Sequence, residues 1–258
     1  MRKLDGKVAI ITGGGGGLGS EASRRLAAEG ARVVVADVDM AAATRVASEL
    51  GDRGFAYHFD YRDEKSIKGL IDATIARWGR HDLLDNNGTA TTAGDGPIET
   101  ADAAVWDLVY QVTMRGYVLA SKYAIPHLRA AGGGLIINMG SDSARSGDLQ
   151  LSAYGAMKAA VLTLTQYIAT QYGKEGIRCV SITPGLILTQ TARSYIGEEG
   201  IAMMESHHLT PRLGIPADLA ALVAFLASDE SVFLTGINIP LDGGFLSHLP
   251  TTANLRRP

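Results

Sequence analysis

The sequence predicts an α/β protein whose centre is a doubly wound parallel sheet of about seven strands. Short β-branched runs alternate along the 258 residues with longer segments whose apolar residues recur at helical spacing. Several runs, such as residues 8–12 and 32–37, are apolar throughout instead of alternating, which is typical of strands covered by helices on both faces. No repeat, low-complexity tract or linker interrupts the pattern, so we expect a single domain over residues 1–258.

The expected elements follow from the hydrophobic periodicity and from the turn residues between the runs. Strands are expected near residues 8–12, 32–37, 54–59, 82–86, 134–139, 177–182 and 236–240. Helices are expected near residues 18–29, 40–50, 63–78, 101–130, 152–173 and 216–228. Residues 190–213 fit neither pattern, and the glycines and proline in this insert predict a mobile flap over a substrate site.

Composition argues against several classes of protein. The formal net charge of −3, with lysines and arginines scattered along the chain, argues against nucleic acid and anionic membranes as partners. No run of 18 apolar residues and no apolar signal region is found, so we expect a soluble, cytoplasmic protein. The single cysteine, Cys179, lies in an apolar run and is expected in the core. The pair His207-His208 lacks partners for a metal site, so none is expected.

A glycine-rich turn, Gly13 to Gly19 with Leu18 in it, follows the first expected strand and opens a helix. Such a turn lets the backbone approach a pyrophosphate, and the helix N-terminus favours negative charge there. A glycine run alone also fits a flexible turn, but its place between strand and helix favours a Rossmann-like dinucleotide site.

The second expected strand ends at Asp37, whose carboxylate is placed to accept hydrogen bonds from a ribose and to repel a 2′-phosphate. Val38 follows, and no lysine or arginine lies within the glycine turn. The sequence therefore favours NAD over NADP as cofactor.

The pattern Thr12-Gly13-x-x-x-Gly17-x-Gly19 resembles the glycine motif of the short-chain dehydrogenase/reductase family. The resemblance extends along nearly the whole chain, through Asp60-Tyr61, the Asn86-Asn87 block, the segment from Pro184 to Thr189 and the block Leu241-Asp242-Gly243-Gly244. It implies that Asn86 braces strands and that Asp60 and Val112 lie near the adenine. The implied NAD-binding residues are Gly13, Gly16, Gly17, Leu18, Gly19, Asp37, Asp60, Tyr61, Asn87, Val112, Tyr154, Lys158, Ile187 and Thr189.

Tyr154 and Lys158 are spaced i and i+4, so they are adjacent on one helix face, where a lysine can lower the pKa of a phenol. Ser141 follows an expected strand, at the end where open α/β sheets bind ligands. The resemblance implies that Tyr154 is the general acid/base, that Lys158 binds ribose and tunes the phenol, and that Ser141 orients the substrate oxygen. The implied reaction is NAD-dependent hydride transfer between a secondary alcohol and a ketone.

Two positions depart from the family pattern. Thr113 stands where the family usually carries an asparagine that helps to hold a water in a proton relay. Threonine has a shorter side chain without the amide, so the relay uses Thr113, uses another water arrangement or is weakened. Asp85 lies inside an otherwise apolar strand, where an unpaired carboxylate is costly. We expect it to be hydrogen-bonded or to have a shifted pKa.

The loop before Tyr154 is polar, and Ser143 and Gln150 are placed to hydrogen-bond a second substrate oxygen. Apolar surface is expected from Leu149, Leu186, Ile196 and Met203 or Met204. The expected substrate is therefore a secondary alcohol or ketone with a second polar group, such as a cyclic diol, a hydroxy acid or a hydroxysteroid, and the sequence does not choose among them.

Two further hypotheses concern turnover and assembly. The competing functional class is an NAD-binding sensor or structural subunit that has lost turnover, which the altered Thr113 makes conceivable. The family resemblance also implies a homotetramer or homodimer, and the long expected helices 101–130 and 152–173 suit pairing across a two-fold axis.

Overall fold

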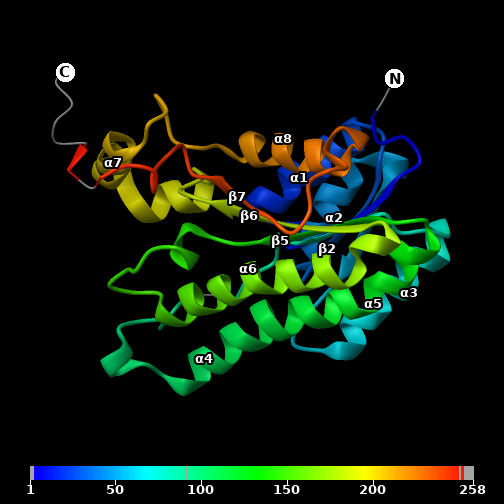
Figure 1. Cartoon of the computed structure of the whole chain (residues 1–258), viewed down its shortest axis with the longest axis horizontal. Coiled ribbons are helices and arrows are strands. Elements are labelled where there is room, and N and C mark those ends of the chain that lie inside the picture. The colour runs from blue at the N-terminus through cyan, green and yellow to red at the C-terminus, as the bar shows by residue number, and fades with distance from the viewer. Residues whose placement is uncertain (1–2, 91, 250, 253–258) are drawn as a thin grey trace.

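The computed structural model describes residues 3–90, 92–249 and 251–252. Its centre is a seven-stranded sheet in the order β3-β2-β1-β4-β5-β6-β7, with every neighbouring pair parallel (Figure 1). The strands are β1 (Val8–Thr12), β2 (Arg32–Asp37), β3 (Gly54–His58), β4 (Leu83–Asn86), β5 (Gly134–Met139), β6 (Ile177–Pro184) and β7 (Asn238–Leu241). The strand order reverses between β1 and β4, and such a switch point opens a crevice at the carboxyl ends of the strands.

Helices cover both faces of the sheet (Figure 1). One layer contains α1 (Gly17–Ala28), α2 (Met40–Glu49) and α8 (Pro216–Ala227). The other contains α3 (Glu64–Trp78), α4 (Ala103–Val109), α5 (Gly116–Ala130) and α6 (Ser152–Tyr172). None of the helices in the described ranges has both the length and the apolar character needed to cross a bilayer.

The alternation of side chains along each strand builds two cores, one on each face of the sheet. Ile10 and Val34 face the α3–α5–α6 layer, whereas Ile11 and Val35 face the α1–α2–α8 layer. All four side chains are fully buried, and such burial contributes about 1.5–3 kcal/mol per side chain. The uniformly apolar strands thus reflect burial on both faces, as the sequence predicts.

Two segments differ from the sequence-based expectation. The single helix expected over 101–130 is α4, a π-helical turn at Tyr110–Arg115, and α5. The expected flap at 190–213 is largely helical, because Gln190–His207 forms α7. Gly197 interrupts α7 with φ 73° and ψ 168°, a conformation that glycine adopts without a Cβ clash.

A chain of buried hydrogen bonds joins the carboxyl ends of the central strands. The Tyr61 hydroxyl lies 2.8 Å from Thr12 Oγ1 and donates to Asn86 Oδ1 at 2.9 Å. Asn86 Nδ2 donates to Asn138 Oδ1 at 2.9 Å, and Asn138 Nδ2 donates to Thr165 Oγ1 at 3.0 Å. These five side chains connect β1, β4 and β5 to α6, so the expectation that Asn86 braces strands is confirmed.

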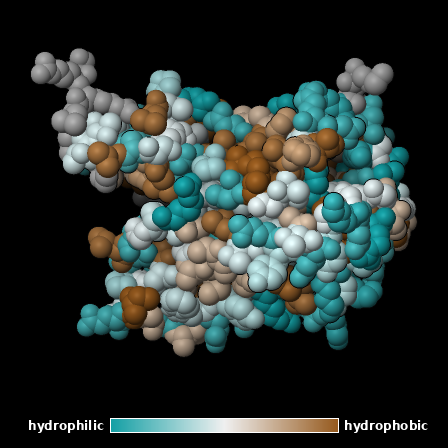
Figure 2. Space-filling model, viewed as in Figure 1, coloured by the Kyte–Doolittle hydropathy of each residue, from teal (hydrophilic) through white to brown (hydrophobic). Residues whose placement is uncertain are grey.

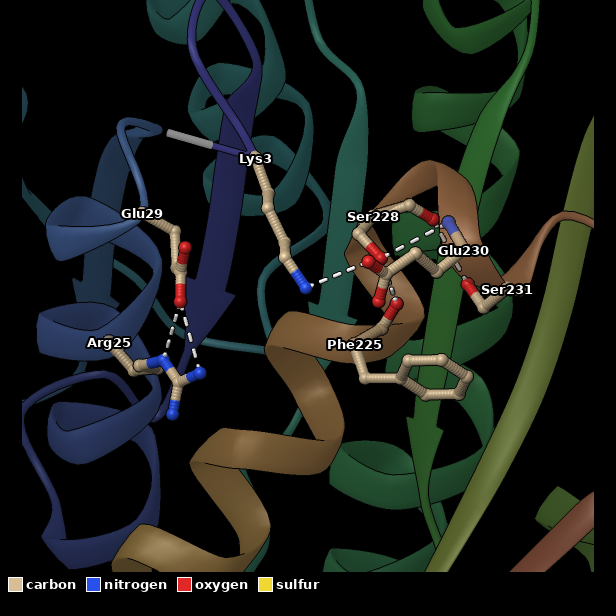
Figure 3. A network of polar contacts seen from close by, with 7 residues as sticks. All are labelled: Lys3, Arg25, Glu29, Phe225, Ser228, Glu230 and Ser231. Atoms are coloured by element: carbon tan, nitrogen blue, oxygen red, sulfur yellow. Dashed lines mark hydrogen bonds and ion pairs between the residues drawn. The ribbon is translucent and has the colours of Figure 1, made fainter. Parts of the chain in front are cut away.

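The amino-terminal segment is attached to the end of α8 (Figure 3). Lys3 Nζ lies 2.8 Å from Glu230 Oε1, just after α8, and the Ser228 hydroxyl accepts a hydrogen bond from the Glu230 amide. Nearby, Arg25 and Glu29 form an i,i+4 ion pair on α1 at 3.0 Å. Exposed pairs of this kind typically contribute about 0–1 kcal/mol each, so they supplement the apolar packing of α1 against α8.

His81, between α3 and β4, should make the folded state sensitive to acid. Its ring is fully buried, neither nitrogen has a hydrogen-bond partner in the described ranges, and burial lowers its pKa to about 3. In the unfolded chain the His81 ring takes up a proton near pH 6.5, whereas in the folded protein it does so near pH 3. Between these two values protonation favours the unfolded chain, so the free energy of unfolding falls as the pH falls from 6.5 towards 3. Between pH 7 and pH 5 we expect His81 to account for about 2 kcal/mol of the fall in unfolding free energy.

Urea unfolding at pH 7 and pH 5 measures the contribution of His81. Between these pH values the unfolding free energy of His81→Leu should fall by about 2 kcal/mol less than that of the wild type. His58→Leu is the matched control, because His58 is exposed on β3. Equal pH dependence in His81→Leu and wild type would contradict the prediction.

Candidate active site

The turn between β1 and α1 is shaped by close backbone contacts. Gly13 has φ 61°, and a Cβ there would lie 2.9 Å from Gly88 Cα. A Cβ on Gly19 would lie 2.3 Å from the Gly13 carbonyl oxygen, so glycine is required at both positions. Gly16 is different, because a Cβ there would lie no closer than 3.5 Å to the nearest atom among the described residues, the Gly13 carbonyl oxygen. Gly16 is the N-cap of α1 and supplies no side-chain cap, which leaves the helix N-terminus suited to an anion.

Asp37 is fixed at the end of β2 by backbone donors. Its Oδ2 accepts from the Gly15 amide at 2.9 Å and its Oδ1 accepts from the Asp39 amide at 3.0 Å. The neighbouring Val38 side chain is 60% exposed and carries no charge. The edge of the glycine turn therefore has a fixed negative charge, as the sequence predicts.

A cavity of about 470 Å³ lies between the glycine turn, the end of β2 and the segment after β4. Its lining includes the predicted Gly13, Gly16, Gly17, Leu18, Gly19, Asp37, Asp60, Tyr61, Asn87 and Val112. A glycine cradle, a fixed acid and an uncapped helix N-terminus at one cavity fit an adenine dinucleotide such as NAD.

Several residues of this cavity were not predicted from the sequence. Phe59, Arg62, Ala90 and Leu108 also line it. Leu108 precedes Val112 by about one helical turn, a spacing that would have indicated its position. Arg62 pairs with Asp60 at 2.6 Å and lowers the pKa of that carboxyl group, so its guanidinium is already engaged.

A second cavity, of about 270 Å³, adjoins the first and lies at the carboxyl ends of β5 and β6. The two share Leu18, Asn87 and Thr89. The predicted Ser141, Tyr154, Lys158, Ile187 and Thr189 line the second cavity together with Met139, Gly140, Pro184, Gly185 and Leu186. Figure 2 shows the surface hollowed between α7 and the segments below it, on the side where the strands end. The dinucleotide cavity thus continues into the candidate catalytic site.

Ser141 and Tyr154 come from different elements and meet at this cavity. Ser141 follows β5, and its Oγ accepts from the Ser143 amide at 3.2 Å. Burial raises the pKa of the Tyr154 phenol, and a hydrogen bond from Ser141 opposes that rise. Burial is the larger of these two effects on the Tyr154 pKa, and the lowering that the sequence predicts from Lys158 stays a prediction.

Lys158 lies one turn beyond Tyr154 on α6 and is 1% exposed. Its Nζ donates to the Met139 carbonyl oxygen at 2.6 Å and to the Tyr117 hydroxyl at 3.4 Å, and lies 5.6 Å from the centre of the Tyr154 ring. Burial lowers the pKa of Lys158 to about 7, with Asp85 acting in the opposite direction. Burial thus works against the positive charge of Lys158, and the negative charge of Asp85 favours it.

Asp85 lies on β4 between Ile11 of β1 and Ile137 of β5. It is fully buried, and its carboxylate oxygens have no hydrogen-bond partner among the described residues. Burial raises its pKa to about 7, and Lys158 moderates the rise. Of the two alternatives expected from the sequence, the lack of a hydrogen-bond partner among the described residues favours the shifted pKa.

Thr113 lies in the π-helical turn and is fully buried. Its hydroxyl makes no hydrogen bond with any residue in the described ranges. The alternatives that the sequence leaves for the relay at Thr113 therefore stay predictions.

Most of the predicted substrate contacts lie outside the second cavity. In the described part of the chain, neither Ser143 nor Gln150 lines it, and Gln150 is exposed. Leu149 and Met203 are also exposed, at 86% and 59%. Of the apolar residues proposed for the pocket, Leu186 is the one that lines it.

Comparisons with known proteins agree on one family. A family model described as enoyl-(acyl carrier protein) reductase matches residues 14–246. A probable short-chain type dehydrogenase/reductase of Bradyrhizobium diazoefficiens is 41% identical over 98% of this chain and 92% of its own. A 7α-hydroxysteroid dehydrogenase of Bacteroides fragilis is 40% identical over 97% of this chain and 98% of its own.

A solved structure shows the same fold. It is of a 7α-hydroxysteroid dehydrogenase complexed with NADH and 7-oxoglycochenodeoxycholic acid, and it matches with a TM-score of 0.88 and 33% sequence identity. The match covers 94% of this chain and 95% of that one.

The fixed carboxylate of Asp37 generates a prediction about cofactor choice. NAD should bind at least about tenfold more tightly than NADP, equivalent to about 1.4 kcal/mol, because Asp37 repels a 2′-phosphate and Arg62, the cation among the described residues that line the cavity, is paired with Asp60. Asp37→Ala combined with Val38→Arg should shift the preference towards NADP. Fluorescence titration with NADH and NADPH gives both dissociation constants.

Asp39→Ala is the matched control for this titration. It removes a nearby carboxylate that caps α2 and does not line the cavity. This variant should keep the preference of the wild type. Equal affinities of the wild type for the two cofactors would refute the assignment.

Proposed function

The chain belongs to the short-chain dehydrogenase/reductase family, and we propose that it acts through Ser141, Tyr154 and Lys158 on a cyclic or polar-substituted secondary alcohol or the matching ketone. It is an NAD-dependent oxidoreductase that interconverts a secondary alcohol and a ketone by hydride transfer. The observation that carries the proposal is that these three side chains line one cavity, which continues into the dinucleotide cavity.

The dinucleotide supplies the hydride chemistry when bound, accepting a hydride in one direction and donating it in the other. The proposed adenosine side is formed by Asp37, Asp60, Asn87 and Val112, which line the larger cavity. The proposed nicotinamide side is formed by Ile187 and Thr189, which line the smaller one. Thr189 also caps α7 through its Oγ1, so that cofactor contacts and the start of the substrate flap share one residue.

Tyr154 is the proposed general acid/base. Reduction of a ketone needs a proton at the new alkoxide oxygen, and oxidation needs a base for the alcohol proton. Because burial raises the pKa of Tyr154, the phenol favours keeping its proton on Oη, from which it can donate to a ketone oxygen. Ser141 is proposed to hydrogen-bond the same substrate oxygen as Tyr154. It also hydrogen-bonds the Tyr154 phenol, which opposes the effect of burial on the pKa of that phenol. A positively charged Lys158 stabilises the phenolate that forms.

A cyclic secondary alcohol of the hydroxysteroid type is the proposed substrate class. The support is the 40% identity to a 7α-hydroxysteroid dehydrogenase over almost the full length of both chains. The cavity beside Tyr154 also has apolar walls from Met139, Leu186 and Ile187, which suit a ring system better than a charged chain. The segment 190–213, with α7, is the proposed flap over this substrate.

The alternative, an NAD-binding sensor without turnover, is less well supported. It rested on Thr113, but Ser141, Tyr154 and Lys158 are all present at one cavity. A cytoplasmic location is also part of the proposal, since dissolved NAD is the cofactor that this site would take. A screen of secondary alcohols with NAD, followed by NADH absorbance, tests turnover and substrate class together.

We also propose that the protein is a homotetramer or homodimer. Apolar side chains are exposed on the helices expected to pair, namely Tyr110 at 48%, Val118 at 39% and Tyr167 at 63%. Light scattering at micromolar concentration should give two or four times the mass of one chain. Tyr167→Glu together with Val118→Glu should reduce that mass, whereas a monomeric wild type would contradict the assembly.

Tyr154→Phe tests the proposed mechanism. The change keeps the ring and its packing but removes the group that exchanges a proton with the substrate oxygen. General acid–base catalysis is typically worth about 10²–10⁴-fold, so kcat should fall by that order while NADH affinity stays nearly unchanged. Lys158→Met should reduce both kcat and NADH affinity, because Lys158 is proposed to contact the ribose as well as to tune the phenol. Full turnover by Tyr154→Phe on a verified substrate would refute the mechanism.

A further inference from the structure

The first turn of α6 is capped by a residue far away in sequence. Asp95 lies in the loop after β4, separated by 58 residues from Ala153, and its carboxylate is 6% exposed. Oδ1 accepts from the Ala153 amide at 3.0 Å, and Oδ2 accepts from the Tyr154 amide at 2.8 Å. Each oxygen thus satisfies one N–H group that the helix itself leaves unpaired at its N-terminus.

The local sequence supplies no such cap. Leu151 occupies the N-cap position, and its apolar side chain makes no capping hydrogen bond. It has φ 63° and ψ 34°, and in the described ranges it is the sole non-glycine residue with positive φ. An apolar residue in the left-handed region is disfavoured, so surrounding contacts must hold it there.

The loop around Asp95 supplies those contacts. The Leu151 amide donates to the Asp95 carbonyl oxygen at 3.0 Å, and Ser152 Oγ donates to the Gly96 carbonyl oxygen at 2.8 Å. Together with the two carboxylate contacts, these bonds join residues 95–96 to residues 151–154. The entry of the chain into α6 is therefore set by the loop after β4.

This clamp bears on catalysis because Tyr154 is itself one of the capped residues. Ser141 belongs to the end of β5, and Lys158 is held separately by the Met139 carbonyl oxygen. Tyr154 lies in the first turn of α6, where helices fray most readily, and its amide is bound directly by Asp95. Without the cap, the phenol would lose its fixed position relative to Ser141 and Lys158.

We propose that Asp95 is a positioning residue for the reaction, holding the first turn of α6 so that the Tyr154 phenol meets Ser141 and the substrate oxygen. The proposal rests on the role of Tyr154 put forward above. Displacement of a reacting group by about 1 Å can cost on the order of 100-fold in rate. The cofactor cavity is lined mainly by other elements, so its affinity should be affected much less.

Asp95→Ala is the test, and Asp102→Ala is the matched control. Asp102 caps α4 by accepting from the Ala104 amide at 2.8 Å and is exposed, so its loss removes the same type of cap away from Tyr154. We expect Asp95→Ala to lower kcat by about 10–100-fold with the Kd for NADH changed by less than about threefold. Asp95→Asn keeps one acceptor oxygen and should recover much of the lost kcat. Asp102→Ala should keep the kcat of the wild type.

Hydrogen exchange at individual amides gives a readout independent of turnover. In Asp95→Ala, exchange should accelerate at Ala153 and Tyr154 but not at Val161 or Ile168, deeper in α6. Unchanged exchange at the first two amides would overturn the proposal, and so would a kcat equal to that of Asp102→Ala. A wild-type protein that turns over but is insensitive to Tyr154→Phe would instead refute the proposed mechanism, which the exchange result alone does not address.

Discussion

The arrangement of the site depends on the alignment of three strand ends by one chain of buried hydrogen bonds. Thr12, Asn86 and Asn138 each stand at or near the carboxyl end of a central strand, and Tyr61 and Thr165 extend the chain to either side. The glycine turn follows the first of these strands, Asn87 the second and Ser141 the third. Because each polar group is buried, breaking one bond would leave its partner unsatisfied. This series of hydrogen bonds therefore joins the strands and also fixes the position of their carboxyl ends relative to one another.

Above this network, burial dominates the electrostatics. Burial raises the pKa of Asp85 to about 7, lowers that of Lys158 to about 7 and raises that of Tyr154. For Asp85 and Lys158 alike, burial is the larger effect on the pKa, and the charge of the other group opposes it. A buried acid such as Asp85, whose oxygens accept no hydrogen bond from the residues that the structure describes, costs stability. Such groups are tolerated most often near functional sites, where perturbed titration is useful.

Local patterns predicted the elements well, and contacts between distant segments account for what they missed. The bounds of β1, β2 and β5 agree with the runs of apolar residues, because burial on both faces leaves a continuous signal. The glycine turn, Asp37 and the Tyr154–Lys158 pair could also be predicted, since each has a fixed spacing. The cap from Asp95 could not, because no periodicity relates it to α6. The π-helical turn in 101–130 and the helical form of α7 depend on packing that composition does not encode. Ser143 and Gln150 were placed at the pocket from chain proximity alone, and the fold of the loop turns out to govern their direction.

The pairing of β1 with β4 also has a consequence for the synthesis of the chain. Ala9 lies beside Leu83, so the centre of the sheet cannot close while only the first strands have left the ribosome. The hydrogen-bond chain needs Thr165 as well, which comes still later. Until then β1 has an unpaired edge, and a nascent chain with an open strand edge is exposed to aggregation. The same long-range pairing that brings remote residues to one edge of the sheet therefore lengthens the time for which the nascent chain exposes an open strand edge.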